Sequence, residues 1–382
     1  MDQNSMQLAR RLIGEYYSKA PDLSPRNIGQ REFGFGDFER KITYRHLRFG
    51  DWKALKDYMV ANAPPFVSIS AGFYKDPAGR PMENKGLLGA ELVFDLDAND
   101  LNLPCKMEHG PSWVCGKCLG AVKAETTRLV EEFLVPDFGF SQRDIRINFS
   151  GNRGYHIHVD NDTVFALGND ARKEISNYIT ARGMEMGAFF PTLGMRGTRL
   201  DGPKPTDQGW GGKLARGAIN ALNSGTGALM EMGIDKKTAN LLSRKRAEII
   251  LGISNGNWDK VSIPKKAEFW KKLLGSIAVS QSDSIDQNVS TDTGHLIRLP
   301  DTIHGDTGLL AKSVGGVKDL EGFDPMRDAI ALKGERIRVK VNKSHALEIG
   351  GERFGPYSES VAELRAPAAI YLILKRVAEI HA

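Results

Sequence analysis

The amino-acid sequence predicts an α+β fold, in which a mixed β-sheet is flanked by helices and carries a small helical insertion lobe. Apolar and polar residues alternate around residues 91–97 and 145–159, a pattern typical of strands with one buried face. Apolar residues spaced three and four positions apart near both ends of the chain instead predict amphipathic helices. Between residues 181 and 280 the chain becomes basic and helical in character, which indicates a separate lobe.

Length and composition favour a globular protein that divides into two lobes. The chain has 382 residues, of which 41% are hydrophobic, and its formal net charge is +5. A positive balance of this size is compatible with a polyanionic partner but does not identify one. Residues 1–17 lack an apolar signal segment, and no run of about 18 apolar residues occurs. We therefore expect a cytosolic protein that does not contact a membrane.

The N-terminal part is expected to begin the sheet. Its predicted elements are a helix over 5–19 capped by Ser5, a hairpin of strands 31–35 and 41–49 around Gly36 and Asp37, a helix over 51–61 and a buried strand over 66–74. Arg45 lies on the second strand of the hairpin. Its side chain faces either a ligand or solvent.

The strand over residues 91–97 carries the first chemical signal. A period of two places Val93, Asp95 and Asp97 on one face of the strand. Two carboxylates that converge on one point repel each other unless a cation lies between them, and hard oxygen ligands favour Mg²⁺ or Mn²⁺. The alternative is a strand end that runs into the polar loop 98–100.

All three cysteines of the chain lie close together in sequence. Cys105, Cys115 and Cys118, with His109 between them, have the spacing of a tetrahedral zinc site, which we call the zinc knuckle (residues 105–118). Four protein ligands leave no open coordination position, so a structural role is expected. The alternative is a set of free thiols in a reducing compartment.

A second hairpin is predicted after an amphipathic helix over 120–136. Strands 145–150 and 155–159 flank a glycine-containing turn at 151–154. Its polar face collects donors suited to phosphate oxygens: Ser150, Arg153 and His156, with His158 as a further candidate. The alternative for the two histidines is a structural pair.

The remaining chain returns to the sheet after the helical lobe. The expected elements are strands 285–290 and 295–300, a turn at 304–308 with a following segment 309–312, a strand at 337–341 and a last helix over 367–381. The basic residues of the lobe would contact nucleic acid or a partner, or lie in solvent. The division predicted is a core from 1–180 and 281–382 with the insertion lobe at 181–280.

Three of these motifs together resemble the small, catalytic subunit of archaeal and eukaryotic DNA primases. They are the segments 91–97 and 149–156, and 295–300 with His304. The resemblance covers nearly the whole chain in the right order, including the zinc knuckle and the helical insertion. It implies a primase-type catalytic core and template-directed synthesis of short primers from nucleoside triphosphates during DNA replication.

The resemblance also implies roles for individual residues. Asp95, Asp97 and Asp286 match the three carboxylates that hold two catalytic Mg²⁺ or Mn²⁺ ions, with Asp283 and Asp292 as substitutes for the third. The positions that match the nucleotide-binding set are Arg45, Ser150, Arg153, His156, Arg298 and His304. Asn152 stands where many relatives carry a second Arg, and Arg298 where some carry Lys, so weaker triphosphate affinity is expected on one side.

The implied partners are the large primase subunit, in a heterodimer, a single-stranded DNA template, nucleoside triphosphates and the replication machinery. The expected location is the cytoplasm, at the nucleoid in a prokaryotic cell. Two other function classes fit part of the sequence. A metal-dependent nuclease or phosphodiesterase would also use an Asp cluster and histidines, and a zinc-bearing nucleic-acid-binding module would explain the knuckle and the positive charge.

Overall fold

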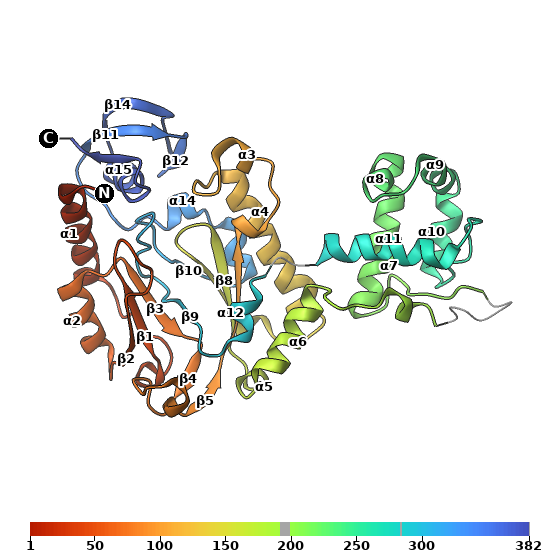
Figure 1. Ribbon diagram of the computed structural model, residues 1–382, viewed down its shortest axis with the longest axis horizontal. Helices are drawn as coiled ribbons and strands as arrows, with labels where there is room; N and C mark the ends of the chain where they lie inside the picture. Colours follow the sequence, from red (N-terminus) through yellow and green to blue (C-terminus); the bar gives the residue numbers. More distant parts are fainter. Residues whose placement is uncertain (192–198, 283–284, 382) are drawn as a thin grey trace. The chain divides into compact units, whose positions relative to one another are not determined.

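A computed structural model describes residues 1–191, 199–282 and 285–381, and it contains both helices and sheets, as the α+β prediction requires. The chain forms two compact units (Figure 1). The first unit comprises residues 1–128, 140–173 and 284–382, and the second comprises 129–139 and 174–283. The first unit holds the sheets, and the second is helical.

The first sheet of the first unit has the order β2-β1-β3-β9, and all its neighbouring strands are antiparallel. Its strands are β1 (Phe33–Gly36), β2 (Tyr44–Leu47), β3 (Phe66–Ser70) and β9 (Leu296–Arg298). The hairpin β1–β2 confirms the first predicted hairpin, although residues 37–43 connect the two strands rather than a tight turn. Figure 1 shows α1 (Gln3–Lys19) and α2 (Trp52–Asn62) beside this sheet.

The second sheet of the first unit has the order β10-β7-β8-β6 and is also antiparallel. The prediction of one mixed β-sheet is therefore wrong, since the strands of the described residues form separate sheets whose neighbouring strands all run antiparallel. Its strands are β6 (Leu92–Asp97), β7 (Ile145–Phe149), β8 (Gly154–Val159) and β10 (Ser313–Gly315). The helix α4 (Gly116–Arg128) packs against β6 and β8. The hairpin β7–β8 is confirmed, and α4, continued by a π-helical turn (Leu129–Leu134), confirms the helix predicted over 120–136 with an earlier start.

The register of β6 and β8 fixes the first chemical residues. Asp95 lies opposite His156, and Asp97 lies opposite Gly154. A Cβ atom on Gly154 would come within 1.9 Å of the carbonyl oxygen of Leu96, so only glycine permits this close approach. The glycine of the predicted turn therefore sets the distance between the two strands.

Further short elements complete the first unit. They are β4 (Gly72–Tyr74), β5 (Leu87–Ala90), α3 (Lys106–His109), α5 (Asp162–Phe165), α6 (Asn169–Ile179, which continues into the second unit), α12 (Gln287–Thr291), α13 (Val317–Gly322), α14 (Pro325–Asp328), β11 (Ile337–Ser344), β12 (Leu347–Ile349), β13 (Glu352–Phe354), β14 (Tyr357–Leu364), α15 (Ala366–Leu374) and β15 (Ala378–Ile380). Short 3₁₀ turns cover 28–30, 82–85, 98–100 and 142–144. The strand predicted at 337–341 is confirmed as the start of β11.

Several predicted boundaries are wrong. The N-cap of α1 is Asp2, whose carboxylate accepts the backbone N–H groups of Asn4 and Ser5, whereas Ser5 itself is buried in the helix. Its hydroxyl accepts the N–H of Ile380 at 3.0 Å. The predicted strand over 66–74 is two strands, since β4 leaves the first sheet to pair with β5.

Two predicted elements near the C-terminus are of the wrong kind. The segment 285–290 is not a strand but leads into α12, because Asp286 caps a helix by accepting the N–H of Asn288. The predicted helix over 367–381 ends at Leu374. Arg376 then adopts a positive φ of 61°, and β15 pairs with β11. Pairing between segments distant in sequence decides the end of this helix.

The second unit is built from helices around aromatic side chains. Its elements are the π-helical turn (Leu129–Leu134), the end of α6, a 3₁₀ turn (Met186–Phe189), α7 (Gly209–Asn223), α8 (Gly225–Glu231), α9 (Lys236–Arg244), α10 (Arg246–Ser254) and α11 (Lys266–Gln281). Trp258 and Trp270 are buried edge to face, with ring centroids 4.8 Å apart. The indole N–H of Trp270 donates to the carbonyl of Trp258. The described part of this unit thus has a core of its own.

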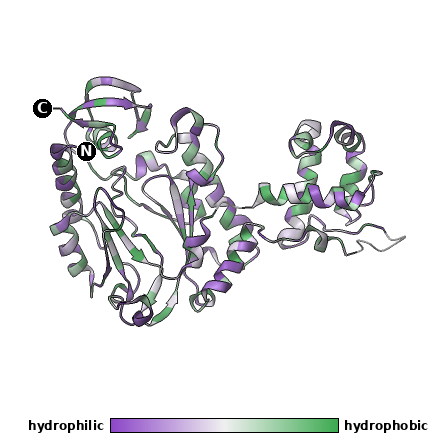
Figure 2. Cartoon of the chain, viewed as in Figure 1, coloured by the Kyte–Doolittle hydropathy of each residue, from purple (hydrophilic) through white to green (hydrophobic). Residues whose placement is uncertain are grey.

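The hydropathy of the surface helices follows the packing. Hydrophobic and hydrophilic residues alternate along α1 and α2, with the buried residues Leu12, Ile13, Leu55 and Met59 among the hydrophobic ones (Figure 2). None of the helices described in residues 1–191, 199–282 and 285–381 combines the length and the apolarity needed to cross a membrane.

A buried ionic network joins the two sheets of the first unit. Arg31, which precedes β1, donates to Glu91 at 2.6 Å, and both side chains are at most 3% exposed. Glu91, which precedes β6, also accepts from Arg146 at 3.2 Å and pairs with His158 at 2.9 Å. These partners hold the pKa of the Glu91 carboxyl well below its usual range despite the burial. Arg31 further donates to the carbonyl of Ser70 at the end of β3.

We predict that Glu91→Gln destabilises the protein by about 3–5 kcal/mol, because removing one member of a buried ion pair leaves Arg31 charged without an anion. Urea unfolding followed by circular dichroism measures this loss. Glu15→Gln is the matched control, because Glu15 pairs with Arg11 on the exposed face of α1. A control variant as unstable as Glu91→Gln would contradict this explanation.

Candidate active site

A pocket of about 360 Å³ lies where residues from the two sheets of the first unit meet. It is lined by most of the site residues predicted from the sequence: Arg45, Asp95, Asp97, Ser150, Arg153, His156, Arg298 and His304. Asp286 does not line the pocket itself. Acidic side chains of β6 and basic side chains of the neighbouring segments thus share one cavity.

Asp95 and Asp97 form the acidic side of the pocket. Burial, together with the negative charges of Asp97 and Asp286, raises the pKa of the Asp95 carboxyl to about 7. The Asp97 carboxylate accepts two hydrogen bonds from Arg153, at 3.0 Å from Nη2 and 3.2 Å from Nε. Of these two acids, Asp97 is compensated by an arginine and Asp95 is not.

The third predicted carboxylate reaches this group from a different element. The backbone N–H of Asp286 donates to the carbonyl of Asp95 at 3.0 Å, which attaches the start of α12 to β6. Asp292 lines the pocket, but its charge acts on Arg45, and its carboxylate accepts the N–H of Gly294. Asp283 lies outside the described residues.

The donor set suits a divalent cation. Carboxylate oxygens are the ligands of Mg²⁺ and Mn²⁺, and here burial and, after it, the repulsion between the carboxylates raise the pKa of Asp95. The pKa of Asp100 is raised as well, by burial and by Asp97 and Asp286. The sequence pattern placed Asp100 only in a polar loop, so this fourth acid was missed.

His156 and His304 are buried and neutral. Burial lowers the pKa of each ring well below its usual value, and the neighbouring cation Arg298 adds to the effect for both. His156 Nε2 lies 3.6 Å from the Asp95 carboxylate, too far for a strong hydrogen bond. The N–H of Asp306 donates to Nδ1 of His304, so the ring proton of His304 belongs on Nε2. His304 can therefore donate one hydrogen bond to a ligand.

Arg298 and Arg45 are fixed by their surroundings. Arg298 lies over the ring of Phe66 at 4.8 Å and is opposite Ser68 in the β3–β9 register. Burial lowers its pKa to about 10, which still leaves it charged at neutral pH. Arg45 donates to the buried Glu32 at 2.9 Å, and Glu32 raises the pKa of the guanidinium. Glu32 gives no signal in the sequence, because only the β1–β2 pairing brings it to Arg45.

The turn between β7 and β8 packs against the loop that carries His304, and so brings together side chains that could donate hydrogen bonds to a phosphate. Gly151 has a φ of 86°, and a Cβ there would lie 2.6 Å from Cβ of His304. Thr307 donates to the carbonyl of Gly151 at 2.5 Å. Ser150 accepts the backbone N–H of Gly154. The turn and the His304 loop are therefore in direct contact, although about 150 residues separate them in sequence.

His158 does not belong to the pocket. Its Nδ1 pairs with Glu91 at 2.9 Å within the buried network. Of the two readings left open for the His156 and His158 pair, the structural one therefore holds for His158. The pocket also contains Lys41, Ser68 and His295, which the sequence patterns did not single out. His295 begins the segment 295–300 that carries the resemblance, but Lys41 and Ser68 lie in no such motif.

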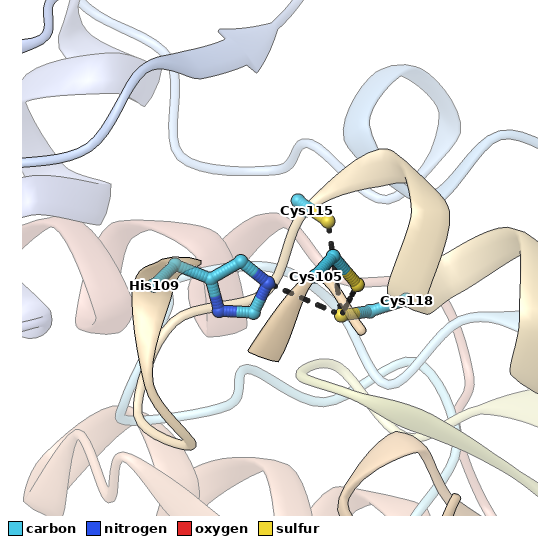
Figure 3. Close-up of side chains that lie close together, drawn as sticks. All are labelled: Cys105, His109, Cys115 and Cys118. Carbon is cyan, nitrogen blue, oxygen red and sulfur yellow. Dashed lines mark hydrogen bonds between the residues drawn. The ribbon is translucent and has the colours of Figure 1, made fainter. Parts of the chain in front are cut away.

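The zinc knuckle residues converge as predicted. One ligand atom from each of Cys105, His109, Cys115 and Cys118 lies within 4.8 Å of all the others. Figure 3 shows the imidazole Nε2 of His109 pointing at Sγ of Cys118, 3.4 Å away. The other ring nitrogen is 2.8 Å from the carbonyl of Gly110, the kind of contact that orients a metal-binding histidine. This group could hold zinc in a closed, structural site.

Comparisons with known proteins point to one family. The family model for the DNA primase small subunit matches residues 94–315. Three archaeal relatives carry the name DNA primase small subunit PriS. The relative from Methanothrix thermoacetophila is 34% identical over 100% of both chains, that from Methanococcoides burtonii 32% over 99% of both, and that from Archaeoglobus fulgidus 32% over 94% of both.

We predict one tightly bound zinc ion per chain, and Cys118→Ser should lose it and lower the thermal midpoint, because a structural zinc ion contributes to folding. Elemental analysis and a thermal melt measure the two effects. His345→Gln is the control, since His345 lies beside His109, with ring centroids 6.2 Å apart, but is outside the ligand group. The prediction would be contradicted by wild-type protein that lacks zinc and yet has the same thermal midpoint as zinc-containing protein.

We predict that Asp95→Asn stabilises the protein at pH 8 in buffer without added divalent cation, raising the thermal midpoint by roughly 2–4 °C, or about 1 kcal/mol. A carboxyl with a raised folded-state pKa loses stability as the pH rises through that pKa, here about 7. The advantage of the variant should therefore shrink as the pH falls from 8 to 5. Asp57→Asn, which changes an exposed carboxylate, should show no such trend. A pH-independent difference for Asp95→Asn would contradict the assignment.

Proposed function

The chain belongs to the DNA primase small-subunit family, and on this premise we propose that it is the catalytic subunit of a primase, a nucleotidyltransferase that makes short primers from nucleoside triphosphates on a DNA template. The observation that carries the proposal is the pocket in which Asp95 and Asp97 face Arg153, Arg298 and His304. A polyanion that binds together with divalent cations suits this pocket, because the cations match its acidic side and the anion matches its basic side.

Asp95, Asp97 and Asp286 would hold two Mg²⁺ or Mn²⁺ ions. When bound, two such ions activate the primer 3′-hydroxyl and neutralise the charge of the triphosphate and the leaving pyrophosphate. We prefer Asp286 to Asp292 as the third acid because its charge acts directly on Asp95.

The protein's own side chains bind and orient the nucleotide. Arg153, now paired with Asp97, is a planar guanidinium suited to phosphate oxygens. Arg298 adds a buried positive charge, and neutral His304 adds an Nε2 donor. Ser150, His156 and Arg45 complete the set on neighbouring strands. Charge neutralisation and positioning are the main demands of phosphoryl transfer, and they require no covalent intermediate.

The partners follow from the same proposal. The chain would act in the cytoplasm, at the nucleoid in a prokaryotic cell, as one half of a heterodimer with a large primase subunit, on single-stranded DNA. We assign the chemistry to the first unit, which holds the pocket, and the zinc knuckle to a structural role. The helical lobe at 181–280 would supply no residue to the reaction.

We predict that Asp95→Asn and Asp97→Asn each reduce primer extension by about 100-fold or more, because several kcal/mol of transition-state charge stabilisation are lost with a metal ligand. The assay is the incorporation of labelled nucleotides on a primed single-stranded template. Asp57→Asn is the matched control, because this exposed carboxylate on α2 pairs with Lys53.

The same assay separates the alternatives. Asp286→Asn should lose as much activity as Asp97→Asn, and a larger loss in Asp292→Asn would make Asp292 the third acid. Degradation of the template by the wild-type protein would indicate a nuclease. Retention of the template without any nucleotide incorporation would indicate a binding module.

A further inference from the structure

Lys375 brings a positive charge to the edge of the pocket from the far end of the chain. It follows the last residue of α15, and its ammonium group donates to Oδ1 of Asn152 at 3.0 Å and to the carbonyl of Ser112 at 3.3 Å. Asn152 lines the pocket and neighbours Arg153 in the β7–β8 turn. The ammonium of Lys375 is thus one hydrogen bond away from the pocket wall.

This ammonium group has no ion-pair partner among the residues that the structure describes. Both of its acceptors are neutral, and no carboxylate of the described residues lies within 4.0 Å of it. Burial lowers the pKa of Lys375 to about 8 even though Asp306 and Asp97 act in the opposite direction. Removing an ammonium from solvent without an anion is destabilising. Lys375 is only half-buried, and its ammonium group lies 5.6 Å from the centre of the Tyr371 ring, a contact that offsets part of this cost. The positive charge that no carboxylate offsets is available to an anionic ligand.

The neighbouring charges point the same way. The pKa of His304 is lowered mainly by burial, and then by the positive charges of Arg298, Lys41, Lys375 and Arg153. All four positive charges therefore act on the His304 ring. The acids near them include Asp97, which already pairs with Arg153. Like charges gathered in this way repel each other unless a multiply charged anion binds among them.

Asn152 connects Lys375 to that anion. An arginine at this turn position would itself carry a charge, and Asn152 does not. Its carboxamide oxygen accepts from Lys375, which leaves the two amide N–H donors for another acceptor. Lys375 lies 223 residues after Asn152 in the sequence, yet it brings a positive charge to Asn152. This is the side of the pocket on which the resemblance implies weaker triphosphate affinity.

We propose that Lys375 and Asn152 together bind the terminal phosphates of the incoming nucleotide, with Lys375 as the cation of the pair. The inference rests on the proposed function and adds a phosphate-binding residue to the same pocket. The expected contribution is to the affinity for the β- and γ-phosphates. The base, the sugar and the template strand would not depend on Lys375.

The experiment compares ligands that differ in phosphate number. Lys375→Met in the full-length chain should raise the Michaelis constant for nucleoside triphosphates about tenfold, as the loss of a charge-assisted hydrogen bond predicts. Inhibition by the nucleoside monophosphate and affinity for the template should not change. Calorimetric titration with inorganic tripolyphosphate should show the same loss, in an assay that requires no polymerisation.

Rescue variants test whether charge is the cause. Lys375→Arg should stay close to wild type, and Asn152→Arg combined with Lys375→Met should regain most of the lost affinity, because the guanidinium replaces the missing cation at the same place. Arg376→Gln is the control, since this neighbouring cation pairs with Glu39 instead. If Lys375→Met fails to fold, the Lys375→Gln variant takes its place in every assay, because glutamine is uncharged but still has an N–H donor for Asn152.

The outcomes separate this inference from the proposed function. Equal losses for the mono- and triphosphate, an unchanged triphosphate affinity in a folded variant, or a loss of template affinity would each overturn the role of Lys375. Wild-type protein that binds tripolyphosphate through Lys375 but incorporates no nucleotide would overturn the proposed function alone. Wild-type incorporation with no dependence on Lys375 would overturn only the inference.

Discussion

The antiparallel pairing of β6 with β8 is the constraint on which the candidate active site depends. This register puts Asp95 opposite His156 and Asp97 opposite Gly154, the first residue after Arg153. A shift of one residue would turn both carboxylates to the other face of the sheet. The backbone contact at Gly154 leaves no room for a side chain, so the close approach of the strands and the position of the acids are set together.

Charge is distributed unevenly around this pairing. The structural acids Glu32 and Glu91 are buried and matched by arginine and lysine or histidine, which fixes the sheets and positions Arg45. In the pocket, by contrast, Asp95 is an acid with a raised pKa, and Arg298 is a buried cation stacked on Phe66. Unmatched charges of both signs are destabilising in the ligand-free protein. A bound nucleotide with its divalent cations would offset both costs, since the cations neutralise the acids and the phosphates neutralise the buried arginine.

Local sequence patterns were sufficient for the parts of the site that lie within one hairpin or one loop. Alternation predicted β7 and β8 and the face that carries Ser150 and His156, and the spacing of Cys105, His109, Cys115 and Cys118 predicted their convergence. These features depend on contacts between residues close in sequence. The resemblance to primase small subunits then pointed to Asp286, Arg298 and His304, which no local pattern distinguishes.

The sequence by itself thus determined the α+β class, the second hairpin, the Asp95 and Asp97 pair and the zinc knuckle, because strand period, turn glycines and ligand spacing are local properties. Only the tertiary structure decided that Asp286 caps a helix beside Asp95, that Glu32 holds Arg45 and that His158 pairs with Glu91. It also decided that Lys375 reaches Asn152 and that α15 gives way to β15. Each of these depends on segments brought together across the fold, where packing and pairing outweigh local preference.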